Sequence, residues 1–229
     1  MNSAPTPKRR LTNYDNKNSL GSRLRAKRLA PLLALIDDVH RQKGQVHLID
    51  MGGTPNYWNI LPEGYLAERN MTITLVNLPG SVKQQDEGHF RFLEGDACNL
   101  NALPDQSYDI VHSNSVIEHV GDWSRRVAFA NEALRLAPHC FVQTPNFWFP
   151  VEPHYMTPFI HWLPKPTQVW WLMQMRLGHM EKAKTVDEAV LTIESIHLLN
   201  RKMMETLFPG TRIWTERVLG LPKSFVAIR

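Results

Sequence analysis

The chain has 229 residues, of which 43% are hydrophobic and 21% are charged, a composition typical of a globular protein with one large domain. No apolar stretch approaches the roughly 18 residues of a membrane-spanning helix, and the first residues lack the apolar core of a secretory signal. The two cysteines, Cys98 and Cys140, do not have metal-ligand spacing. We therefore expect a cytoplasmic protein with reduced cysteines and no metal site.

The net charge of +4 is unevenly distributed along the chain. Residues 1–30 carry eight of the 26 Lys and Arg residues and one of the 22 acidic residues, so the rest of the chain is slightly acidic. We interpret residues 1–21 as a basic, flexible arm. The alternative is an anchor for phosphate, anionic lipid or an acidic substrate. Basic and aromatic residues are not interleaved, which argues against nucleic acid as a partner.

Strands and helices alternate along residues 22–229, which we expect to form a single domain. The apolar patterns predict strands at 46–49, 71–78, 90–93, 108–113, 140–143, 212–218 and 224–228. They predict helices at 22–41, 123–136 and 185–207, with 55–69 helical or irregular. Thr185 and Glu188 have the spacing of a capping box, which places the start of the last helix.

This order of elements predicts an α/β fold. We expect a Rossmann-like, mainly parallel sheet with helices on both faces and an antiparallel hairpin strand at the C-terminus. Ligands bind such sheets beyond the carboxyl ends of the strands. The polar residues at these predicted ends are Asp50, Asn77, Asp96, Ser113 and Asn146.

Residues 147–184 interrupt the alternation, and we predict that they form a cap inserted after the fifth strand. The segment is rich in proline and in large aromatic residues such as Trp162, Trp170 and Trp171. Core packing under the cap is one interpretation of these aromatic residues. An apolar acceptor or a peripheral membrane-surface contact, helped by Lys165 and Arg176, is the alternative.

The first predicted strand ends in Asp50, and Gly52 and Gly53 follow it. Glycine has no Cβ, so a ligand can lie against the backbone there, and the carboxylate can accept hydrogen bonds from hydroxyl or ammonium groups. The chain lacks the Gly-x-Gly-x-x-Gly fingerprint of nicotinamide cofactors. A carboxylate ahead of the glycines would also repel a pyrophosphate. The pattern favours a cationic or neutral nucleoside cofactor.

Three motifs then carry a resemblance to a known family: Asp50-x-Gly52-Gly53, Gly95-Asp96-Ala97, and a stretch over 108–120 that contains Ser-Asn-Ser-Val-x-Glu-His-Val. Over roughly residues 45–146 the chain resembles class I S-adenosylmethionine-dependent methyltransferases, and most closely the small-molecule group with that stretch. The resemblance implies S-adenosylmethionine as the cofactor, S-adenosylhomocysteine as its product, and a small-molecule acceptor.

The resemblance also implies roles for residues at the first two strand ends. Asp50 and the backbone of Gly52 and Gly53 would line the methionine part and the ribose. Asn77 would face the ribose hydroxyl groups. The family usually has Asp or Glu where this chain has Asn77, and it usually has a third glycine in the first loop. The amide is a weaker partner for a hydroxyl group than a carboxylate.

The later strand ends would complete the cofactor site. By the same resemblance, Asp96 and Ala97 would meet the adenine, with Asp96 accepting a hydrogen bond from the exocyclic amine. Ser113 and Asn114 would offer backbone carbonyl groups to the methionine ammonium.

The acceptor pocket is expected beneath the start of the cap. Glu152 could orient His154 as a general base, and Tyr155 could supply a polar group to the pocket. A structural loop histidine is the alternative for His154. His119 and His161 also lie near this edge in sequence and are further candidates for contact with the substrate, although for His119 we prefer a structural role in the strand-to-helix turn.

The sequence therefore predicts methyl transfer from S-adenosylmethionine to a small molecule. We prefer oxygen as the acceptor atom, and an apolar, lipid-linked or sugar-linked acceptor is compatible with the aromatic cap. The alternative is a non-catalytic cofactor-binding or scaffold protein that retains the fold. A nucleotide-dependent oxidoreductase is disfavoured by the missing fingerprint.

Overall fold

The structure is a computed structural model that describes residues 20–81 and 85–229, with side chains from residue 28 onward. The basic arm predicted for residues 1–21 lies, up to residue 19, outside the described residues. In the described ranges, no helix is both long enough and apolar enough to cross a membrane.

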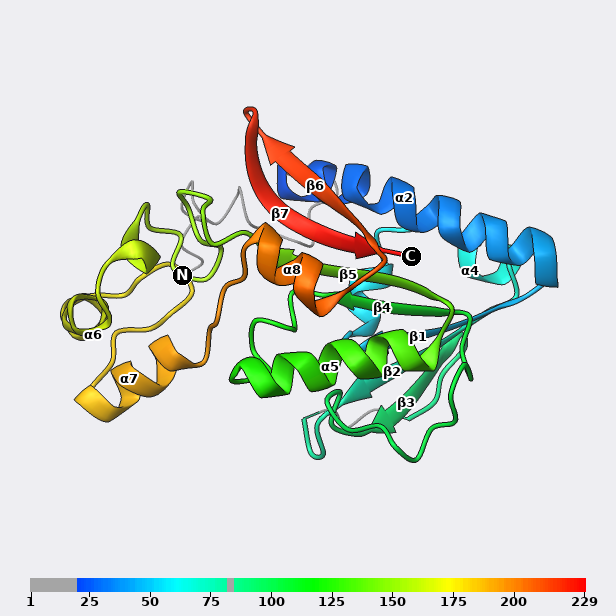
Figure 1. Cartoon of the computed structure of the whole chain (residues 1–229), viewed down its shortest axis with the longest axis horizontal. Helices are drawn as coiled ribbons and strands as arrows, with labels where there is room; N and C mark the ends of the chain where they lie inside the picture. The colour runs from blue at the N-terminus through cyan, green and yellow to red at the C-terminus, as the bar shows by residue number, and fades with distance from the viewer. Residues whose placement is uncertain (1–19, 82–84) are drawn as a thin grey trace, which may run out of the picture.

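A seven-stranded sheet in the order β3-β2-β1-β4-β5-β7-β6 forms the centre of the protein (Figure 1). The strands are β1 (Val46–Met51), β2 (Met71–Asn77), β3 (Phe90–Glu94), β4 (Ile110–Asn114), β5 (His139–Pro145), β6 (Arg212–Val218) and β7 (Leu221–Ile228). The first five strands are parallel, and β7 pairs antiparallel with both β5 and β6. The structure confirms the predicted Rossmann-like sheet and its closing hairpin.

Helices cover both faces of the sheet, as the sequence predicts (Figure 1). On one face lie α2 (Leu20–Lys43), α3 (Pro55–Trp58) and α4 (Tyr65–Glu68), and Leu32 and Ile36 of α2 share a hydrophobic core with β1 and β2. On the other face, α5 (Trp123–Leu136) and α8 (Arg201–Leu207) pack through Phe129 and Met204 against β4 and β5. Pro31 lies inside α2 without ending it.

The cap follows the carboxyl end of β5 and has a small hydrophobic core of its own. It contains the 3₁₀ helix η1 (Ile160–Trp162), α6 (Lys165–Gln174) and α7 (Val186–Glu194), at the left of Figure 1. Tyr155, Leu172 and Ile193 are buried together in this core. The cap core therefore draws its apolar residues from both sides of position 184, where the sequence placed the end of the insertion.

The single helix predicted for residues 185–207 is wrong. Thr185 does accept a hydrogen bond from the backbone N–H of Glu188, but α7 ends at Glu194 and α8 begins at Arg201. Between them, the backbone N–H of His197 donates to the carbonyl oxygen of Glu118 at 2.7 Å. The apolar spacing continues through the break because residues of α7 pack in the cap and residues of α8 pack on the sheet. Periodicity alone does not distinguish these two cores.

Candidate active site

A pocket of about 400 Å³ opens at the carboxyl edge of the sheet, where β1 to β4 end. It contains many of the residues that the sequence assigned to the cofactor. Its lining residues are Gly52, Val76, Asn77, Leu78, Ser81, Gly95, Asp96, Ala97, Ser115, Val116, His119, Val120 and Arg125.

The turn after β1 requires both of its glycines. Gly52 has a φ of +80°, and a Cβ there would lie 2.7 Å from the Val116 side chain. A Cβ on Gly53 would lie 1.8 Å from Oδ2 of Asp50. Side chains at these two positions would meet neighbouring atoms, so the turn requires glycine at both.

The carboxylate of Asp50 points away from this pocket. It is buried, and it accepts hydrogen bonds from Nδ1 of His112 at 2.7 Å and from Nε1 of Trp58 at 3.0 Å. Asp50 therefore lies at the edge that the sequence predicted, while its side chain ties β1 to β4 and to α3. Neither Asp50 nor Gly53 lines the pocket.

Asn77 and Asp96 face the pocket from β2 and from the turn after β3. The amide nitrogen of Asn77 donates to the carbonyl oxygen of Gly53 at 2.9 Å. Asp96 binds Arg125 with both carboxylate oxygens, each at 2.9 Å, and accepts a hydrogen bond from the backbone N–H of Cys98 at 2.9 Å. Partial burial raises the pKa of Asp96, but the Cys98 and Arg125 bonds outweigh it, so the net pKa is lowered.

The loop after β4 turns sharply at Ser115, which has a φ of +56°, unusual for a residue with a side chain. Ser115 and Val116 line the pocket, whereas Ser113 and Asn114 do not. The hydroxyl group of Ser113 is buried and donates to the carbonyl oxygen of Met51 at 2.8 Å. The strained residue thus marks the place where the chain leaves β4 and turns towards the pocket.

Two histidines and a buried carboxylate form a chain of hydrogen bonds at the pocket wall. Glu152 binds Nδ1 of His154, and Nε2 of His154 lies 3.0 Å from Nε2 of His119. Nδ1 of His119 lies 3.1 Å from the carbonyl oxygen of Ser195. His119 is exposed to the pocket, while Glu152 is buried and also accepts the backbone N–H groups of His154 and Tyr155.

Proton counting assigns a charge to this chain. A bond from His154 to ionised Glu152, a bond between the two Nε2 atoms and a bond from His119 to Ser195 together use three protons, one more than two neutral imidazoles carry. Burial lowers the pKa of both histidines, and for His154 the bond and charge of Glu152 outweigh burial, so its pKa is raised. The pKa of His119 is lowered. Of the two rings, His154 is therefore the one that holds an extra proton more readily.

Glu118 lies beneath the histidines and is completely buried. Its Oε2 accepts a hydrogen bond from the hydroxyl group of Thr144 at 3.0 Å, and its Oε1 has no hydrogen-bond partner among the described residues. Burial raises the pKa of Glu118 to about 7. This carboxyl group is therefore mostly neutral below about pH 7 and mostly ionised above it.

The structure places the two other predicted acceptor residues in the cap, away from this pocket. Tyr155 is buried in the cap core, where burial raises its pKa to about 12. His161 is buried, and its Nε2 bonds to the carbonyl oxygen of Phe147 at 2.9 Å. Their assignment to the acceptor stays a prediction.

Arg125 is a charged pocket residue that sequence reasoning missed. It lies in the first turn of α5, where Asp122 caps the helix, and it reaches back to Asp96. The two residues are 29 positions apart, and no motif links them. Only the docking of α5 on the sheet brings them together.

Comparison with known proteins agrees with this geometry. Residues 64–138, from just before α4 to the residue before β5, match the family model of a methyltransferase domain. A crystal structure of a protein from Pyrococcus horikoshii OT3 is similar with a TM-score of 0.53 and 14% identity over 99% of this chain and 98% of that chain. A crystal structure of a SAM dependent methyltransferase from Archaeoglobus fulgidus is similar with a TM-score of 0.49 and 17% identity over 90% of this chain and 92% of that chain. No curated protein matches the sequence.

The family match covers β2, β3, β4, α5 and the loops between them, which together hold every lining residue of the pocket except Gly52. The Pyrococcus structure gives the same fold over nearly the whole chain. Residues 64–138 are therefore similar to a methyltransferase domain, and the fold of the chain is that of a Rossmann-like α/β protein.

Proposed function

We propose that this protein transfers a methyl group from S-adenosylmethionine to an oxygen atom of a small-molecule acceptor. The observation that carries the proposal is the hydrogen-bonded chain of Glu152, His154 and His119, which ends at the wall of the carboxyl-edge pocket. An acid–base pair at the edge of a cofactor pocket is what oxygen methylation needs, because a hydroxyl group must lose its proton as the new bond forms.

The residues of the pocket fit the cofactor. Its volume lies in the usual range for small-molecule sites. Gly52 leaves backbone open to the ligand, and Asn77 can accept from ribose hydroxyls through its carbonyl oxygen, since its amide nitrogen is bound to Gly53. Oδ1 of Asp96 accepts from Cys98 and Arg125, whereas Oδ2 keeps a lone pair beside its bond to Arg125 and can accept from the adenine amine. When bound, S-adenosylmethionine supplies an electrophilic methyl group on its sulfonium sulfur.

The histidine pair would take up the proton of the acceptor. Once the extra proton has left, His154 keeps its Nδ1–H on Glu152, His119 keeps its Nδ1–H on Ser195, and two lone pairs face each other. A proton taken from the acceptor hydroxyl by His119 would then be shared between the two Nε2 atoms. The carboxylate of Glu152 balances the positive charge of this shared proton. The histidine pair therefore has a raised proton affinity, as a general base needs.

The cap supports an acceptor with an apolar part. Large aromatic side chains that are partly or mostly exposed gather on it: Trp148, Phe159, Trp162 and Trp170. Such a surface suits an apolar or lipid-linked acceptor, or peripheral contact with a membrane surface. The two free, buried cysteines support a reducing, cytoplasmic location.

The test compares aromatic acceptors that differ only in bearing a hydroxyl or an amine group. Formation of S-adenosylhomocysteine is measured with wild type, His119→Ala and His40→Ala. His40 lies on α2, on the opposite face of the sheet, and serves as the control. We expect faster turnover of the hydroxyl compounds, a loss of about 100-fold in His119→Ala and no loss in His40→Ala.

Two results would contradict the proposal. Equal turnover of hydroxyl and amine compounds would remove the preference for oxygen. Binding of S-adenosylmethionine without transfer to any acceptor would favour the non-catalytic alternative.

A further inference from the structure

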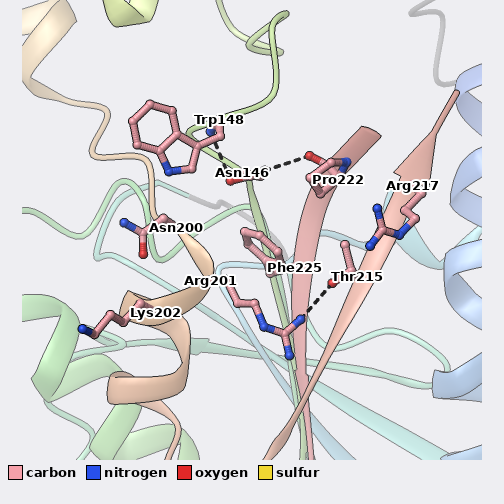
Figure 2. Close-up of a pocket in the computed structure, with 9 residues that line it drawn as sticks. All are labelled: Asn146, Trp148, Asn200, Arg201, Lys202, Thr215, Arg217, Pro222 and Phe225. Carbon is pink, nitrogen blue, oxygen red and sulfur yellow. Dashed lines mark hydrogen bonds between the residues drawn. The ribbon is translucent and has the colours of Figure 1, made fainter. Parts of the chain in front are cut away.

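A second pocket, of about 470 Å³, lies between α8, the β6–β7 hairpin and the turn that follows β5 (Figure 2). Its charged lining residues are all cations: Arg201 and Lys202 at the start of α8, and Arg217 on β6. Figure 2 shows the guanidinium groups of Arg201 and Arg217 on either side of Thr215. No carboxylate is among the described residues that line the pocket.

The positive charge of this pocket is only partly balanced. Arg201 binds Glu205 at 2.8 Å and donates to the hydroxyl oxygen of Thr215 at 3.2 Å. Arg217 donates to the backbone carbonyl of Gly220 at 3.0 Å, and no carboxylate in the described ranges forms an ion pair with Arg217 or Lys202. Unbalanced cations around a concave surface raise the local concentration of anions.

An aromatic residue lies at the rim of the same pocket. Trp148 is 62% exposed, and its backbone is held in place. The backbone N–H of Trp148 donates to Oδ1 of Asn146 at 3.1 Å, and Nδ2 of Asn146 donates to the carbonyl oxygen of Pro222 at 2.8 Å. Asn146 is buried, and Phe225 lines the pocket from β7. The pocket thus joins cations to a flat apolar face.

A short segment links this pocket to the histidine pair. The carbonyl oxygen of Ser195 faces His119 at one end of the segment, and Asn200 lines the second pocket at the other end. Between them, the carbonyl oxygen of Leu199 accepts from the backbone N–H of Phe147 at 2.9 Å. Both pockets therefore lie at the carboxyl edge of the sheet, on either side of residues 195–200.

We propose that the second pocket binds a phosphate group of the methyl acceptor, with Trp148 covering the flat or apolar part next to that phosphate. The inference rests on the proposed function, because it gives the acceptor of that reaction an anionic anchor. Two guanidinium groups and a lysine suit phosphate oxygens, since Arg binds them through paired N–H donors. The phosphate belongs either to a soluble phosphate ester or to a lipid headgroup.

The experiment measures binding of phenyl phosphate and, separately, of S-adenosylmethionine by calorimetry. Arg217→Gln is compared with Arg212→Gln, which removes the same charge from the other end of β6. We expect wild type to bind phenyl phosphate more tightly than phenol, Arg217→Gln to bind it about tenfold more weakly, and Arg212→Gln to match wild type. Sedimentation with phosphatidic acid vesicles, against phosphatidylcholine vesicles, separates the lipid source from the soluble one.

The two proposals fail in different ways. If S-adenosylmethionine binds but phenyl phosphate and phosphatidic acid do not, or if Arg217→Gln binds them as wild type does, the phosphate pocket is refuted and the methyltransferase proposal stands. If phenyl phosphate binds with the expected dependence on Arg217 while S-adenosylmethionine does not bind, the pocket stands and the proposed reaction fails.

Discussion

The Nε2 atoms of His119 and His154 lie 3.0 Å apart, and Glu152 holds the far side of His154. A hydrogen bond between the two Nε2 atoms contains one proton that both rings share. The two imidazoles therefore titrate as a pair and not as separate groups. The raised pKa of His154 and the lowered pKa of His119 place the positive charge next to Glu152. The pair becomes a base only above the raised pKa, when it has lost that charge.

We therefore predict that turnover rises with pH through the pKa of His154 and that Glu152→Gln shifts this rise to lower pH. Burial lowers the pKa of His154, and the amide no longer supplies the charge that outweighs it. The expected shift is about one pH unit, with a lower plateau because the ring is less well oriented. Turnover measured from pH 5 to 9 tests this. An unchanged profile would show that His154 is a structural loop residue.

A second prediction concerns the buried Glu118. Its folded pKa is raised to about 7, above the value of about 4.5 of an exposed glutamate, so its ionisation opposes folding. The free energy of unfolding should fall by about 3 kcal/mol as pH rises from about 4.5 to 7, if this carboxyl group alone is responsible, and it should level off above pH 7. Glu118→Gln keeps an acceptor for Thr144 and should flatten this dependence.

Thermal unfolding of both proteins across this pH range is the measurement for Glu118. Glu63→Gln is the control, because Glu63 is exposed and its neutralisation should leave the pH dependence as in wild type. If Glu118→Gln and wild type lose stability in parallel, Glu118 is not the titrating group.

Asp96→Ala should weaken binding of S-adenosylmethionine at least tenfold. It removes the carboxylate that faces the pocket and leaves Arg125 there without its partner. Asp105→Ala breaks a comparable ion pair with Arg135 away from the pocket and should leave the affinity as it is. Calorimetry on both variants, with unfolding curves to verify their stability, decides the matter. Equal affinities would refute the contact between Asp96 and adenine.

Gly53→Ala should destabilise the protein by about 2 kcal/mol. The new methyl group would overlap the carboxylate of Asp50, which Trp58 and His112 hold in place. Gly95→Ala is the control, because its Cβ would lie 3.0 Å from the end of the Leu100 side chain and in ordinary van der Waals contact with Val76. Denaturant unfolding of the two variants should differ clearly. Equal stability would mean that the turn after β1 can rearrange.

The sheet could be predicted because each strand carries its own local signal. The β-branched run that forms β2 and the Pro209-Gly210 turn that follows α8 are readable without tertiary contacts. The break between α7 and α8 could not be predicted. It arises because His197 and Leu199 bond to Glu118 and Phe147, far away in sequence.

The sequence predicted at which edge of the sheet the candidate site lies, but it did not predict how each side chain is oriented there. Asn77, Asp96 and His119 all reach the pocket, because parallel strands bring their carboxyl ends to one edge. The orientation of Asp50 could not be read from the sequence. Its carboxylate turns towards Trp58 and His112, and the glycines beside it give no indication of this.

Titration of the purified protein with S-adenosylmethionine and S-adenosylhomocysteine tests the central claim most directly. The account predicts one site per chain with micromolar affinity for both, weakened in Asp96→Ala. Absence of binding to either compound would contradict the assignment of the carboxyl-edge pocket and leave a scaffold that keeps the fold without its cofactor.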